Sequence, residues 1–108
     1  MEEFKDHTFV ICAYKESKYL EELIQSLKAQ TVKSNVIMST STPNEYIKKM
    51  AEKYSLRLFI NKNNFGIGPD WNFAVSKVKT KYVTVAHQDD LYDKHYTEEV
   101  YKAVNKYS

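Results

Sequence analysis

Two adjacent carboxylates, Asp89 and Asp90, follow the apolar run 82–86 after two intervening residues and are the strongest chemical signal in the sequence. Like charges side by side repel each other, so they need a cation or local hydrogen-bond donors. Hard carboxylate oxygens bind divalent cations such as Mg²⁺ and Mn²⁺, and such a cation can also hold a diphosphate. Asp90 could instead cap the helix that follows. Asp89 lies too early to cap that helix, and we therefore assign it to a metal.

The asparagine-rich segment 61–68 is a second candidate, because it contains both glycines of the chain and ends directly before Pro69. Proline is favoured at the first position of a helix, where backbone N–H groups can face an anion or a polar ligand. Asparagine–glycine segments are also ordinary turns. Tyr14 and Glu16, after the first apolar run, could stack on a base and bond a ribose hydroxyl, or could simply be exposed side chains.

Four apolar runs of strand length alternate with four segments whose apolar residues recur at helical spacing. The predicted strands are 8–13, 35–38, 56–60 and 82–86, and the predicted helices are 18–30 and those beginning near 43, 69 and 93. This alternation is typical of parallel βαβ units with right-handed crossovers. We predict an α/β fold, a Rossmann-like three-layer sandwich with a mainly parallel four-stranded sheet, in one domain spanning 1–108.

Particular residues predict where the helices start. Ser17 is the expected N-cap of the first helix. Thr42, Pro43 and Glu45 form an expected capping box at the start of the second helix. Asp93 is the expected cap of the last helix, which leaves Asp89 for chemistry.

All strand-to-helix loops of a parallel sheet emerge at its carboxyl edge, and ligands bind there. The loops concerned are 13–17, 39–42, 61–68 and 87–92. The unusual polar residues of the sequence are concentrated in these loops, whereas the helix-to-strand loops contain ordinary Lys, Thr and Ser. The pattern therefore predicts a ligand site at this edge.

Composition excludes several classes of protein. A chain of 108 residues with 43% hydrophobic and 14% aromatic residues can bury one core and is not expected to be disordered. The net charge of +2 and the dispersed lysines do not indicate a nucleic-acid partner. Cys12, the single cysteine, is expected to be buried and inert. No signal peptide or membrane-spanning run is present, so we expect a cytoplasmic protein, with membrane association only through segments outside this chain.

Three stretches of the chain, in order, resemble family 2 glycosyltransferases of the GT-A fold. The first is 9–16, followed by a helix that ends in the pattern SL..QT. The second is 61–72, which is similar to the family's N.G...A.N segment. The third is 82–90, which is similar to the family's Y...LD.DD segment. The match covers nearly the whole chain. It implies the N-terminal, nucleotide-sugar-binding half of such an enzyme.

The resemblance implies roles for individual residues. Asp89 matches the last acid of the family's DXD motif, which binds Mn²⁺ or Mg²⁺ under the donor diphosphate. The residues assigned to donor binding are Ala13, Tyr14, Glu16, Thr40, Asn64, Gly66, Asn72 and His87, and those assigned to the metal are Asp89 and His87. The implied partners are a nucleotide-diphosphate sugar, with a UDP-sugar favoured, and a sugar or glycoconjugate acceptor, as in polysaccharide biosynthesis.

The sequence departs from the family pattern in three ways. His87 occupies the first position of the DXD motif, where a histidine nitrogen can still ligate a metal or bond a ribose. Segment 39–42 is Ser-Thr-Ser-Thr where the family has Asp-Asp-Gly-Ser, whose acid contacts the base or ribose, and this puts uridine preference in question. The acceptor site and the catalytic base belong to a second half. We therefore expect a truncated chain that does not transfer sugar alone, and we assign no catalytic residue.

Other functions remain open at this point. Segment 86–90 also resembles the AHPDDE zinc motif of LmbE-like deacetylases, but Gln88 replaces Pro and Leu91 replaces Glu. A non-catalytic GT-A-like binding module would explain the changed acids. A sugar nucleotidyltransferase would need a glycine-rich loop after the first strand, and segment 13–17 has no glycine.

Overall fold

The structure is a computed structural model and describes residues 3–62, 67–87 and 90–107. Strands and helices alternate in the order β1 (Glu3–Ala13), α1 (Leu20–Lys28), β2 (Lys33–Thr40), α2 (Glu45–Lys53), β3 (Arg57–Ile60), α3 (Ile67–Ser76), β4 (Tyr82–His87) and α4 (Tyr96–Tyr107). The strands form one sheet in the order β3-β2-β1-β4, and each neighbouring pair is parallel. The predicted α/β class and parallel sheet are confirmed.

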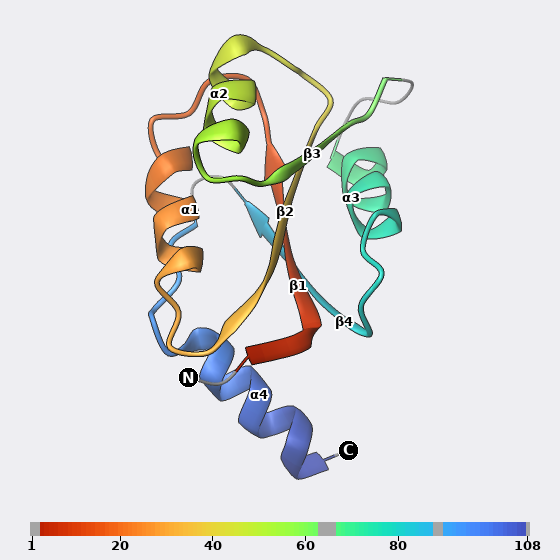
Figure 1. The fold of residues 1–108 in the computed structure, drawn as a ribbon. Helices are drawn as coiled ribbons and strands as arrows, with labels where there is room; N and C mark the ends of the chain where they lie inside the picture. Colours follow the sequence, from red (N-terminus) through yellow and green to blue (C-terminus); the bar gives the residue numbers. More distant parts are fainter. Residues whose placement is uncertain (1–2, 63–66, 88–89, 108) are drawn as a thin grey trace.

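Helices α1 and α2 cover one face of the sheet and α3 covers the other, which makes three layers (Figure 1). Alternate residues of a strand point to opposite faces, so Phe9, Ile11 and Ala13 of β1 pack beneath α1 and α2. The predicted apolar stripe of α1, with Leu20, Leu23, Ile24 and Leu27, is buried against them. Helix α4 extends from the end of the molecule at which the N-terminus also lies. No described helix is long and apolar enough to cross a membrane.

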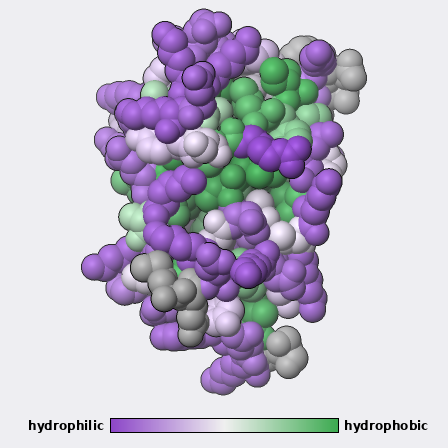
Figure 2. Space-filling view, viewed as in Figure 1, coloured by the Kyte–Doolittle hydropathy of each residue, from purple (hydrophilic) through white to green (hydrophobic). Residues whose placement is uncertain are grey.

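The face of the sheet beneath α3 is less completely covered. Ala74 of α3 is fully buried, but Trp71 and Val75, predicted to share its apolar stripe, are 43% and 42% exposed. Figure 2 shows hydrophobic residues at the surface in the centre of one side of the molecule, framed by hydrophilic ones. The periodicity of α3 therefore predicted the helix correctly but not the burial of its apolar residues.

The start of α1 differs from the prediction. Ser17 lies two residues before the observed N-cap, Tyr19, whose side chain makes no capping hydrogen bond. The hydroxyl of Ser17 accepts the N–H of Tyr19 at 3.2 Å, and its carbonyl oxygen accepts that of Leu20 at 3.2 Å. Ser17 thus closes a turn that leads into the helix, because the chain must first cross the edge of the sheet.

The start of α2 also differs. The N-cap is Asn44, whose side-chain oxygen accepts the N–H of Ile47 at 2.8 Å. The predicted capping box at Thr42 is therefore wrong. The hydroxyl of Thr42 instead accepts the N–H of Lys15 at 2.6 Å, which ties the β2–α2 loop to the loop after β1. Asparagine is as good a cap as threonine, so the tertiary contact decides between them.

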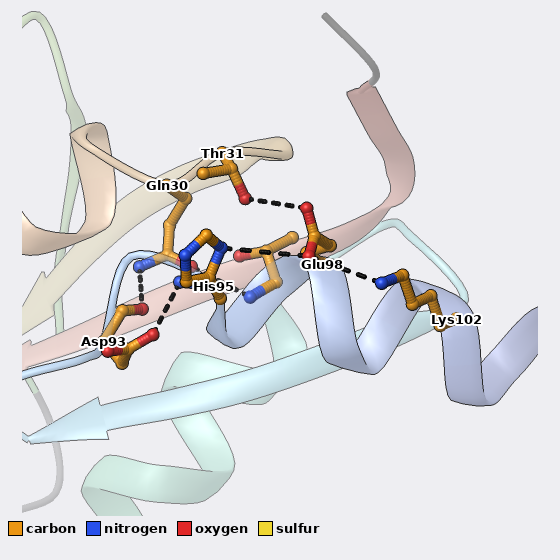
Figure 3. Close-up of polar contacts among 7 residues, drawn as sticks. Gln30, Thr31, Asp93, His95, Glu98 and Lys102 are labelled. Atoms are coloured by element: carbon orange, nitrogen blue, oxygen red, sulfur yellow. Dashed lines mark hydrogen bonds and ion pairs between the residues drawn. The ribbon is translucent and has the colours of Figure 1, made fainter.

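Gln30, two residues after α1, links the end of this helix to segment 90–97. This residue is 1% exposed. Its side-chain nitrogen donates to the carbonyl oxygen of Asp93 at 2.7 Å (Figure 3). The same nitrogen donates to the carbonyl oxygen of Ser26 at 3.0 Å, and the side-chain oxygen accepts the N–H of Thr97 at 2.8 Å. The hydroxyl of Ser26 accepts the N–H of Tyr92 at 3.3 Å. Ser26 and Gln30 of the SL..QT pattern therefore anchor segment 90–97.

Asp93 stabilises the turn before α4 and does not cap the helix as predicted. Its carboxylate accepts the N–H of His95 at 2.8 Å, and its carbonyl accepts the N–H of the first helical residue at 3.0 Å. Within α4, Glu98 lies 3.8 Å from the His95 ring nitrogen and accepts from Lys102 at 3.4 Å. The carboxylate of Glu98 also accepts a hydrogen bond from the Thr31 hydroxyl at 3.3 Å (Figure 3). Thr31 therefore links the start of α4 to the residues that follow α1.

Candidate functional site

A cavity of about 990 Å³ opens at the carboxyl edge of the sheet. Its walls come from five places: the end of β1 and the loop after it (12–14 and 16–19), the end of β2 and the loop after it (39–42), Asn61 after β3, residues 70, 71 and 73 of α3, and His87 at the end of β4. The structure thus brings together the four predicted strand-to-helix loops, as far as they are described. The volume lies at the upper end of the range typical of small-molecule sites.

Most of the predicted donor-binding residues that are described line this cavity. They are Ala13, Tyr14, Glu16, Thr40 and His87. Asn72 is exposed on α3 and is not among the lining residues. Asn64, Gly66 and Asp89 lie outside the described residues, so their predicted roles remain predictions.

Sequence reasoning missed the contribution of α3. Asp70, Trp71 and Phe73 of this helix line the cavity. Trp71 was taken only as part of an apolar stripe, and Asp70 was not singled out. Both directly follow an edge loop, and the first turn of a helix in a βαβ unit faces the carboxyl edge of the sheet. Their proximity to that loop was the signal that could have identified them.

The loop after β1 has an unusual backbone. Lys15 has a φ of 53°, in the left-handed region that residues other than glycine seldom occupy. Two contacts hold the loop in this conformation: the N–H of Lys15 donates to Thr42, and the Tyr46 hydroxyl donates to the carbonyl oxygen of Ser17. The neighbouring Tyr14 is 50% exposed while lining the cavity. The loop therefore presents an aromatic surface from a fixed position.

A polar cluster joins the ends of β2 and β3 to the start of α3. The Ser41 hydroxyl donates to one carboxylate oxygen of Asp70 at 3.1 Å, and the Asn61 side-chain nitrogen donates to the other at 3.3 Å. Burial raises the pKa of the nearby Cys12 thiol, the hydrogen bond from Ser39 lowers it, and the Asp70 charge raises it. Cys12 therefore stays a protonated thiol in the cavity wall, and it is half-buried, less enclosed than predicted.

His87, at the end of β4, contacts Trp71 and hydrogen-bonds Asp90. The His87 ring lies 5.1 Å from the Trp71 ring, measured between centroids. Asp90 donates its N–H to the carbonyl oxygen of His87 at 2.9 Å, and its carboxylate accepts the N–H of His87 at 3.3 Å. Both the N–H and the carboxylate of Asp90 therefore hydrogen-bond the backbone of His87. Among the described residues, no group of three His, Cys, Asp or Glu side chains could hold a metal.

Comparison with known proteins identifies the family. Residues 8–108 match the model of glycosyl transferase family 2. The chain is 36% identical over 90 residues to an uncharacterised glycosyltransferase of Methanocaldococcus jannaschii, a match that covers 76% of this chain and 31% of the relative.

A solved structure shows the same fold. The crystal structure of TarS from S. aureus superposes with a TM-score of 0.83 over 98% of this chain and 33% of that chain, at 20% sequence identity. The chain thus spans about a third of the length of the proteins it matches. Because the family model covers almost all of its residues, this chain belongs to glycosyltransferase family 2.

Proposed function

We propose that the cavity at the carboxyl edge binds a nucleotide-diphosphate sugar, the donor for transfer of the sugar to an acceptor hydroxyl. The observation that carries this proposal is the set of groups around one cavity: the aromatic ring of Tyr14, the carboxylate of Glu16, the hydroxyl of Thr40 and the imidazole of His87. An aromatic face suits a base, whereas carboxylate and hydroxyl groups suit a ribose. Asp89, which the resemblance assigns to the metal, follows His87 by two residues in the chain, so we place the diphosphate at the His87 end of the cavity.

We propose that a divalent cation, Mn²⁺ or Mg²⁺, is held by His87 and Asp89, the two residues that the family resemblance assigns to the metal. His87 lines the cavity. The remaining ligands of such a cation would come from diphosphate oxygens and water. When bound, the cation neutralises the charge that develops on the leaving diphosphate. The carboxylate of Asp90 accepts the backbone N–H of His87 and thereby helps to position His87.

The acceptor site and the base that deprotonates the acceptor hydroxyl are assigned to no residue of this chain. The matched relatives are about three times longer than the matched region. The proposal for this chain is therefore limited to binding of the donor. The family model covers nearly the whole chain, so we do not propose the zinc deacetylase.

Calorimetric titration with UDP, with and without MnCl₂, tests donor binding. We expect Mn²⁺ to increase the affinity for UDP and Asp89→Ala to lower the manganese-dependent affinity by about tenfold or more, equivalent to at least about 1.4 kcal/mol. Asp6→Ala is the matched control, because this aspartate is exposed on β1 and does not line the cavity. Folded protein that binds no UDP in either condition would contradict the proposal and favour a non-catalytic module.

Tyr14→Ala tests the placement of the base. Stacking of a base on an aromatic ring contributes about 1–3 kcal/mol, so UDP affinity should fall by roughly 5- to 150-fold. Tyr14→Phe keeps the ring and should bind nearly as the wild type does. Equal losses in the two variants would show that the hydroxyl, and not the ring, contacts the ligand.

A further inference from the structure

Asp70 lines the cavity and is held there by two neighbouring elements. Ser41, after β2, donates to one of its carboxylate oxygens at 3.1 Å, and Asn61, after β3, donates to the other at 3.3 Å. Asp70 is partly buried. Because the donors come from two sides, the carboxylate has a defined position in the cavity wall.

Only neutral groups contact this carboxylate among the described residues. No Lys, Arg or His of the described chain forms an ion pair with Asp70. Removing a carboxylate from water costs free energy unless hydrogen bonds or charges compensate. The first turn of α3 offers partial compensation through the helix dipole. A carboxylate can accept about four hydrogen bonds, and among the described residues the side chains of Ser41 and Asn61 supply two of them.

The charge of Asp70 restricts which part of a nucleotide lies next to it. A diphosphate is anionic and is repelled by the carboxylate, so the phosphates lie away from Asp70. An ionised carboxylate only accepts hydrogen bonds, so the group opposite it must be a donor. The imide N3–H of uracil is such a donor. Cytosine has a lone pair at N3, which the carboxylate would repel, and its nearest donor is the exocyclic amine at C4.

We propose that Asp70 selects the base of the nucleotide donor by accepting a hydrogen bond from an imide N–H, which favours uracil over cytosine. This inference rests on the proposed nucleotide-binding function of the cavity. It would give a preference for uridine a physical origin on α3, in a cavity whose wall at 39–42 carries only hydroxyl side chains.

Titration of the wild-type protein with UDP, CDP and N3-methyl-UDP in the presence of Mn²⁺ is the first test. We expect UDP to bind about tenfold or more tightly than either analogue, because a site built to accept a hydrogen bond rejects ligands that lack the donor. This measurement needs no variant, so it does not depend on how Asp70 substitutions affect folding. Equal affinities for UDP and CDP would overturn the inference.

Asp70→Asn is the second test, since the amide keeps the shape of the side chain and can donate to N3 of cytosine. We expect UDP to bind about tenfold more weakly and the UDP-to-CDP affinity ratio to approach one. Glu45→Gln is the matched control, because it neutralises an exposed first-turn acid of α2 outside the cavity and should change neither affinity.

The outcomes separate this inference from the proposed function. Equal weakening of UDP and CDP by Asp70→Asn would place the carboxylate against a group common to both nucleotides, such as the ribose, and would overturn base selection. Unchanged binding of both would overturn it as well. A folded wild-type protein that binds none of the three nucleotides would overturn the proposed function and this inference together.

Discussion

Replacing Gln30 with alanine is expected to lower the free energy of unfolding by about 3 kcal/mol, because buried backbone groups lose their hydrogen-bond partner. The Gln30 side chain bonds the carbonyl oxygen of Asp93 and the N–H of Thr97 at 2.7 and 2.8 Å. Thr97 is completely buried, so water cannot replace the lost bond without entering the core. Each orphaned group costs about 1–3 kcal/mol, and the void left by the side chain adds to this.

Urea denaturation followed by circular dichroism measures this change. Gln25→Ala, in α1, is the matched control, because the side chain of Gln25 makes an exposed hydrogen bond to the Tyr54 hydroxyl at 3.1 Å. We expect the control to lose less than about 1 kcal/mol. Equal losses in the two variants would show that Gln30 does not anchor segment 90–97. Gln30→Ala should also weaken UDP binding, because segment 90–97, which Gln30 anchors, directly follows Asp89 in the chain.

Acidification is expected to destabilise the protein through His7, by about 3 kcal/mol between pH 7 and pH 4. His7 is 1% exposed, and burial lowers its pKa from 6.5 to about 4. Its two ring nitrogens hydrogen-bond the hydroxyls of Ser34 and Thr84, both at 2.8 Å, and its ring packs against Phe9 at 4.7 Å. These partners are neutral, so nothing among them compensates a positive charge on the ring.

The sign follows from the protons bound by each state. Below pH 6.5 the unfolded chain takes up a proton on His7 that the folded chain takes up only near pH 4. The contribution of His7 is therefore fully present above about pH 6.5 and is lost as the pH falls toward 4.

Comparing the wild type with His7→Phe across this pH range isolates the effect from the titration of carboxylates, which both proteins share. The variant should be less stable at pH 7, because Ser34 and Thr84 lose a partner, but its stability should fall less steeply with acid. Ser34→Ala keeps the buried ring and should keep the wild-type pH dependence. A pH dependence in His7→Phe as steep as in the wild type would contradict this explanation.

The anchoring role of Gln30 also gives a physical meaning to part of the family resemblance. The SL..QT pattern at the end of α1 was used in the sequence only as a sign of the family. In the structure, Ser26 and Gln30 of this pattern contact segment 90–97, more than sixty residues along the chain. The serine and glutamine of this pattern therefore connect the end of α1 to segment 90–97.

The amino-acid sequence alone was sufficient for the α/β class, the parallel sheet and the edge at which the site lies. These properties depend on local periodicity: apolar runs such as 8–13 and 82–86 form buried strands, and the stripe from Leu20 to Leu27 forms a helix. Once strands and helices alternate, the geometry of parallel crossovers places the strand-to-helix loops together. Tyr14, Glu16 and His87 could thus be assigned to one site before the structure was known.

Only the tertiary structure decided which further groups share that site and how the helices begin. The strand order β3-β2-β1-β4, the choice of Asn44 over Thr42 as the cap of α2, and the contact of Asp70 with Ser41 all depend on residues distant in the chain. Local sequence does not specify such contacts, because a hydroxyl or carboxylate can bond its own backbone, a neighbouring loop or water at similar cost. The choice is made when packing of the core brings one particular partner within hydrogen-bonding distance.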